Sequence, residues 1–219
     1  MNSPRIVTAD IRIAIAIALY VLLLALLPLL LPDPLFRFTF SEEGPFEQMS
    51  IAAWIFTALV IVVRIRPLGP RAWAFALLCM IFAAREADWH KAFTADSILK
   101  TNYYKHAIAP FGEKLAAAGV ALAAIVLLLY VGFVVARFLL RDGGWRSRAG
   151  IWLIAGTALV VLGKILDRAP AVLAEDYDIV LSPIVDLYAA AFEEGLEVIH
   201  PLILAWSVWI SQTGRRYLS

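Results

Sequence analysis

Residues 13–31 read IAIAIALYVLLLALLPLLL, an apolar run without any charged residue, and this run decides the fold class. A helix needs about 20 mainly apolar residues to cross the hydrocarbon core of a bilayer. The run is too long for the apolar region of a signal peptide, and no small-x-small cleavage motif follows it. It is therefore predicted to be a membrane anchor that ends at Pro32 and Pro34.

The rest of the chain has the same character. Of its 219 residues, 62% are hydrophobic and the mean hydropathy is +0.81, whereas about half of a soluble domain is apolar. Strands of a membrane barrel are short and alternate in polarity, but these apolar runs are long and continuous. The sequence predicts an all-α protein, a polytopic membrane bundle of six transmembrane helices that forms a single domain over residues 1–219. The spans are expected at residues 11–32, 46–64, 72–90, 114–140, 150–168 and 186–211.

The charged residues predict the orientation. With six spans, eleven of the nineteen Lys and Arg residues fall on one side, among them Arg215 and Arg216. Only two of the eighteen carboxylates, Asp10 and Asp142, fall on that side. Because Lys and Arg accumulate on the cytoplasmic side of membrane proteins, both termini are predicted to be cytoplasmic. The net charge of +1 argues against a nucleic acid as partner. Membrane lipids are the expected partners, and a homo-oligomer is compatible with the sequence.

Several charged residues fall inside the apolar stretches. Each costs about 2.5–3.5 kcal/mol on insertion scales, so such residues indicate a functional site. Three of the predicted spans contain them: Arg85, Glu86, Asp88 and His90; Lys164, Asp167 and Arg168; and Glu193, Glu194, Glu197 and His200. The acids outnumber the cations, which indicates bound cations, protonated acids or both. Pro201 follows directly and is predicted to kink the last helix.

A divalent metal ion, zinc or iron, is one predicted occupant of this region. Glu86 and His90 are four residues apart and Glu197 and His200 are three apart, so each pair shares a helical face. Helix bundles supply metal ligands in this way. The candidate ligands are Glu47, Glu86, His90, Glu197 and His200. A zinc site made of His90, His106 and His200 is a second arrangement.

Acid–base chemistry on a lipid headgroup is the second hypothesis. The candidate catalytic residues are Glu86, Asp88, Glu193, Glu194 and Glu197, and the candidate headgroup ligands are Arg85, Lys164 and Arg168. The predicted function is a membrane enzyme, a metal-dependent hydrolase or transferase that acts on a lipid or lipid-linked substrate at the periplasmic face. One alternative is a non-catalytic ion or small-solute transporter, or a subunit of a membrane complex. Another is a salt-bridge network that only fixes helix packing, with Lys164 paired to Glu193 or Glu194 and Arg85 to a glutamate of the last helix.

Residues 91–113 form the one long segment predicted outside the membrane. Charged residues alternate there with aromatic and aliphatic ones, so short amphipathic helices on the outer interface are expected. Such a segment would cover any site that opens to that face.

Two strings of the sequence carry a resemblance. Residues 85–94 read READWHKAFT, and residues 97–104 read SILKTNYY. With Lys164-Ile165-Leu166-Asp167-Arg168, they resemble a group of uncharacterised proteobacterial inner-membrane proteins. The resemblance implies a multi-pass protein of the bacterial inner (cytoplasmic) membrane, and it implies no particular activity.

Overall fold

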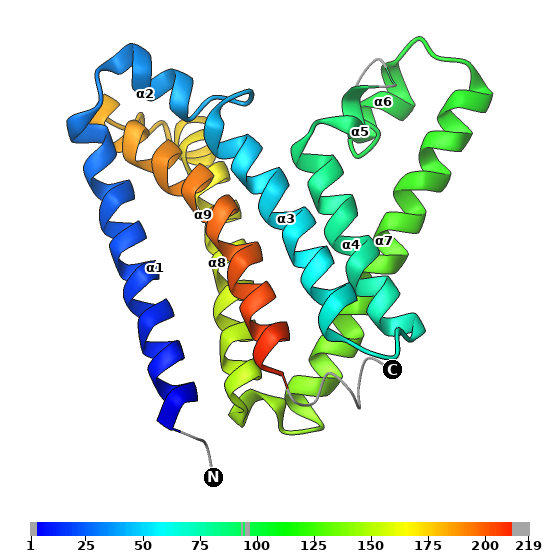
Figure 1. Ribbon diagram of the computed structural model, residues 1–219. Coiled ribbons are helices and arrows are strands. Elements are labelled where there is room, and N and C mark those ends of the chain that lie inside the picture. The colour runs from blue at the N-terminus through cyan, green and yellow to red at the C-terminus, as the bar shows by residue number, and fades with distance from the viewer. Residues whose placement is uncertain (1–3, 93, 95–96, 212–219) are drawn as a thin grey trace. The chain divides into compact units, whose positions relative to one another are not determined.

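The computed structural model describes residues 4–92, 94 and 97–211, with side chains from residue 8 onward. The regular structure of these residues is helical, and no strand occurs among them (Figure 1). The all-α prediction is therefore confirmed. Phe93 of the READWHKAFT string, and Arg215 and Arg216 of the orientation argument, lie outside the described residues.

Each of the six apolar stretches forms a long helix. They are α1 (Pro4–Leu30), α3 (Pro45–Arg64), α4 (Pro70–Glu86), α7 (Phe111–Leu140), α8 (Arg148–Tyr177) and α9 (Pro183–Ile210). Shorter elements lie between them: α2 (Asp33–Thr39), α5 (Trp89–Ala92), α6 (Thr101–His106) and the 3-10 turn η1 (Gly144–Arg146). The helices α3, α4 and α9 begin with proline, which suits the first helical position because its missing N–H has no partner there anyway.

Four of these helices are long and apolar enough to cross a membrane: α1 from Thr8, α3, α7 and α8. The helix α4 has 17 residues, and α9 carries Glu193, Glu194 and Glu197 near its centre. Those features explain why α4 and α9 do not qualify by length and composition alone. The helices fit a membrane protein, and the count of six spans stays a prediction.

The chain divides into two compact units. The first contains residues up to 47 and residues 159–199. Its core includes Phe36 and Phe40, whose ring centroids are 4.7 Å apart, and the fully buried Leu24. The Tyr20 hydroxyl donates a hydrogen bond to the carbonyl oxygen of Gly195 at 2.8 Å. A Cβ atom at Gly195 would collide with the Leu24 side chain, so glycine permits this contact between α1 and α9.

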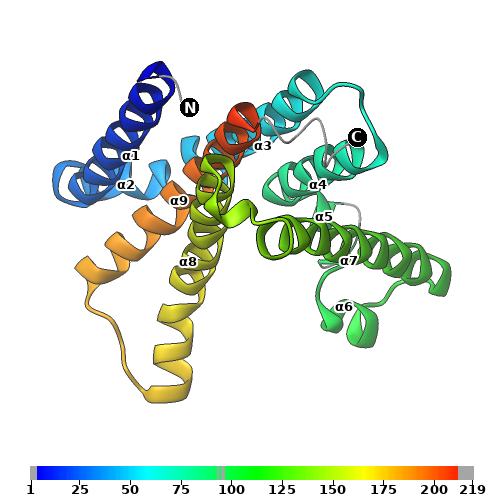
Figure 2. The ribbon, with the colours of Figure 1, turned by 90° about the horizontal axis from the view of Figure 1, so that it is seen from below.

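The second unit contains residues 48–158 and those from 200 onward. Its core lies along α3 and α4, where Trp54 stacks on Phe82 with a centroid distance of 4.6 Å. The end of α9 is joined to this core, since the Thr57 hydroxyl lies 2.8 Å from the carbonyl oxygen of Pro201. In the same unit α4 lies beside α7, and α5 and α6 connect their ends (Figures 1 and 2). This arrangement positions the site described next.

Candidate functional site

The turn that ends α4 builds the first part of the site. The helix stops at Glu86, and Asp88 has a φ of 55°, in the left-handed region. Aspartate enters this region more readily than most residues because its short side chain can bond locally. The helix therefore does not continue to His90 as the sequence predicted, and Glu86 and His90 do not share one helical face. Left-handed backbone at a non-glycine residue costs on the order of 1–3 kcal/mol and is found often at active sites.

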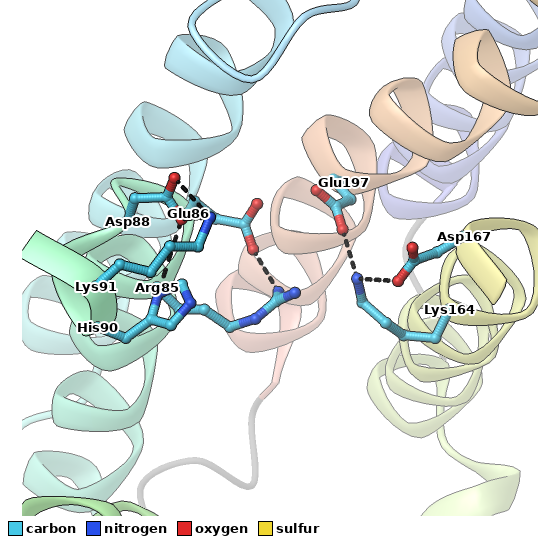
Figure 3. Close-up of polar contacts among 8 residues, drawn as sticks. All are labelled: Arg85, Glu86, Asp88, His90, Lys91, Lys164, Asp167 and Glu197. Carbon is cyan, nitrogen blue, oxygen red and sulfur yellow. Dashed lines mark hydrogen bonds and ion pairs between the residues drawn. The ribbon is translucent and has the colours of Figure 1, made fainter. Parts of the chain in front are cut away.

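Five charged or titratable residues gather at this turn, and we call them the 85–91 cluster: Arg85, Glu86, Asp88, His90 and Lys91 (Figure 3). The Arg85 Nη1 atom pairs with Oε1 of Glu86 at 2.8 Å, and the Glu86 side chain is only 9% exposed. The Lys91 Nζ atom pairs with Oδ1 of Asp88 at 2.9 Å. Arg85 thus pairs with its neighbour in the chain. The cluster holds a cation, carboxylates and an imidazole within one turn of chain.

His90 is the imidazole of this cluster, and it lies beside Asp88. Its side chain is 18% exposed, and Nδ1 lies 3.8 Å from Oδ1 of Asp88. That nitrogen is buried and has no hydrogen-bond partner among the described residues. A neutral imidazole can accept a proton near neutral pH. Catalytic hydrogen bonds are often long without substrate and shorten when it binds.

A groove between α4 and α7 leads to the cluster. Its volume is about 810 Å³, within the range of ligand sites in proteins. The walls are apolar and include Leu77, Ile81, Val120, Ala124 and Leu127. Arg85 and His90 line it as well, together with Trp89, Ile98 and Leu99. No carboxylate occurs among the described residues that line the groove. It is thus an apolar channel with a cation and an imidazole on its wall.

Residues 97–106, which we call the roof segment, lie beside the 85–91 cluster, and Ile98 and Leu99 of this segment line the groove. Hydrogen bonds hold the segment in place. The Ile98 amide donates to the carbonyl oxygen of His90 at 3.1 Å, and the Tyr104 hydroxyl donates to that of Ile98 at 2.7 Å. The Tyr103 hydroxyl donates to Oε1 of Glu113 on α7 at 2.7 Å. Tyr103 is fully buried, and burial together with Glu113 raises its pKa to about 12, so the hydroxyl keeps its proton. The short helices expected within residues 91–113 occur here as α5 and α6.

A second charged group lies in the first unit, and we call it the Lys164 cluster. The Lys164 Nζ atom is 2.9 Å from Oε1 of Glu197 and 3.4 Å from Oδ2 of Asp167 (Figure 3). The Glu197 side chain is 14% exposed. The ion pair connects α8 to α9 through Glu197, an acid that the packing alternative in the sequence did not name. A contact of this kind is typical of an ion pair that fixes the packing of two helices. Glu193 belongs to the Lys164 cluster, because its side chain hydrogen-bonds Asp167 and interacts electrostatically with Lys164 and Glu197.

The other predicted residues lie elsewhere along the helices. Glu47 lies in the first turn of α3, where a carboxylate interacts favourably with the helix dipole. Glu194 is half-buried, while Arg168 and His106 are exposed. His200 is buried, and its ring contacts Trp54 edge-on with a centroid distance of 5.0 Å.

The groove itself was not predicted. Ala121, Ala123 and Ala124 leave room for it on α7, but α7 is apolar all round and its sequence does not show which face is hollow.

The metal hypothesis has a direct test. Among the described residues, no three His, Cys, Asp or Glu side chains converge in an arrangement that could hold a metal ion. A bound metal therefore stays a prediction. If the enzyme is metal-dependent, anaerobically purified protein should contain about one zinc or iron ion per chain, as structural or catalytic sites bind tightly. Elemental analysis that finds well under one metal ion per chain, with and without added zinc or iron, would contradict the hypothesis that the protein binds a metal. It would leave the acid–base chemistry of His90 untouched.

Comparison with known proteins finds no matching family model, no matching curated protein and no matching solved structure. The chemistry of the 85–91 cluster and its groove is therefore what points to a function.

Proposed function

We propose that this protein is a multi-pass membrane enzyme with six spans, a hydrolase or transferase that acts on a lipid or lipid-linked substrate at the periplasmic face. One observation carries the proposal. His90 is mostly buried, faces Asp88 through Nδ1, and lies with Arg85 on the wall of an apolar groove. A base, an orienting carboxylate and a cation beside an apolar channel suit a substrate with a charged head and an apolar chain.

The chemistry follows from these groups. The Nε2 atom of His90 takes the proton of the attacking water or alcohol, whose oxygen bonds to the ester carbon or phosphorus of the substrate. The bond to the leaving alcohol breaks, and the imidazolium returns the proton to that oxygen. Asp88 orients the ring and stabilises its protonated form. Arg85, held by Glu86, binds the anionic group of the substrate.

Replacing Asp88 by asparagine tests the orienting role. Asparagine also tolerates the left-handed backbone that this position requires, so the turn should keep its shape. The carboxylate that faces His90 is lost, and kcat is expected to fall by at least about tenfold while KM changes by less than about twofold. The measurement is steady-state release of labelled product from a lipid in proteoliposomes.

Asp178 supplies the matched control. It has the same φ of 55° but lies beyond the end of α8, in the other unit. The change Asp178→Asn should leave both kinetic constants as they are in the wild type. An Asp88→Asn protein with unchanged kcat would remove Asp88 from the mechanism.

A further inference from the structure

We infer that the groove between α4 and α7 binds one acyl chain of an anionic glycerophospholipid, with the lipid phosphate at Arg85. The inference deepens the proposed function and rests on it, because it names the substrate class of the same site. The binding itself is measurable without turnover.

The length of the groove fits one acyl chain. Its walls run from Leu77 to Arg85 on α4 and from Val120 to Tyr130 on α7. At 1.5 Å rise per residue, these stretches are about 12 and 15 Å long. The hydrocarbon core of a bilayer is about 30 Å thick, so one leaflet, and hence one acyl chain, occupies about half of that. A groove of this length beside a single cation matches one chain below its headgroup.

The groove is open along one side. Leu77 and Val120 line it and are 55% and 61% exposed. A two-chain lipid can therefore place one chain in the groove and leave the other in the surrounding bilayer. This favours a membrane glycerophospholipid over a free, single-chain ligand.

The charge on the groove wall favours one kind of headgroup. Arg85 is the charged residue among the described residues that line the groove. Its pair with Glu86 uses Nη1, and a guanidinium has further N–H donors for an anion. A guanidinium binds phosphate through a planar pair of donors, and such charge-assisted bonds are strong in an apolar environment. The roof segment next to Arg85 is fixed by the hydrogen bonds of Tyr103 and Tyr104. Binding of a lipid should therefore cost little conformational entropy in this segment. A net negative headgroup is the one this site should prefer.

Native mass spectrometry of the purified, delipidated full-length protein in detergent tests the inference. The probes are phosphatidylglycerol and phosphatidylcholine with identical acyl chains. The wild type should bind phosphatidylglycerol at least about tenfold more tightly, because only this headgroup is a net anion. The change Arg85→Gln should reduce the preference to less than about threefold. Arg137→Gln, at the other end of α7 and not lining the groove, should keep it.

A second pair of variants tests the groove. Ala124 lines it, whereas Ala116 lies on the same helix, is exposed and does not line it. The change Ala124→Phe fills the groove and should weaken the binding of phosphatidylglycerol at least about tenfold. Ala116→Phe should leave this affinity unchanged. If Ala124→Phe does not fold, the comparison of Arg85→Gln with Arg137→Gln tests the inference by itself.

Three results would overturn the inference. Equal affinity of the wild type for the two lipids would indicate annular lipid only. An Arg85→Gln protein with full preference, or a folded Ala124→Phe protein with full affinity, would contradict the site. Selective binding without any turnover would leave the inference standing and defeat the proposed enzyme. Equal affinity together with turnover that depends on His90 would defeat the inference and leave the proposed enzyme standing.

Discussion

His90→Gln is expected to lower kcat by at least about 100-fold, because positioned general bases contribute about 10² to 10⁴. The amide keeps much of the size and polarity of the ring but cannot take a proton at neutral pH. Thermal stability should stay near the wild-type value, because glutamine can still hydrogen-bond the Arg85 backbone that the imidazole contacts. Lipid affinity, measured by native mass spectrometry, should also be retained. The assay is product release in proteoliposomes at saturating lipid.

His106→Gln is the matched control for this change. His106 is exposed on α6 and lies at the end of the roof segment, so its replacement should leave kcat unchanged. Wild-type turnover in the His90→Gln protein would show that the reaction does not use this imidazole.

The Lys164 cluster should be a determinant of stability. Glu197→Gln is expected to destabilise the protein by about 2 kcal/mol, less than the roughly 3–5 kcal/mol for a fully buried pair, because Lys164 is half-exposed. The reason is that Lys164 loses the carboxylate at 2.9 Å, which is nearer than the Asp167 carboxylate at 3.4 Å. The measurement is reversible unfolding of the purified protein in mixed micelles.

Two further variants make this prediction specific. Glu175→Gln is the same chemical change at an exposed position of α8 and should cost less than about 0.5 kcal/mol. Lys164→Met combined with Glu197→Gln removes both charges of the ion pair, so the double variant should return to within about 1 kcal/mol of the wild type. A Glu197→Gln protein as stable as Glu175→Gln would show that the ion pair contributes little.

Much of the fold follows from the sequence, for identifiable reasons. The apolar runs locate the six long helices, and prolines such as Pro45 and Pro183 mark where helices begin. The break after Glu86 could not be predicted, because neither Ala87 nor Asp88 is a strong helix breaker. Asp88 adopts its left-handed backbone in the context of the folded turn. The number of membrane spans is likewise not decided by helices alone, since the acids of α9 offset its apolar content.

The candidate site was predicted in part. Charge inside apolar sequence singled out Arg85, Glu86, Asp88 and His90, and the structure brings these four together at one turn. It also indicated Lys164 and Glu197, whose pairing depends on how α8 and α9 pack and not on spacing along the chain. The groove depends on which side chains of α7 face α4, and an all-apolar helix carries no pattern that reveals this.

The central claim is that the 85–91 cluster performs chemistry on an anionic lipid. It is tested most directly by reconstituting the wild-type protein in vesicles with labelled phosphatidylglycerol and phosphatidylcholine and following each lipid over time. The account predicts a labelled product from phosphatidylglycerol in the wild type and none in His90→Gln vesicles. Intact phosphatidylglycerol in wild-type vesicles, whose protein nevertheless binds that lipid selectively, would contradict the enzyme and indicate a non-catalytic lipid-binding or transport role.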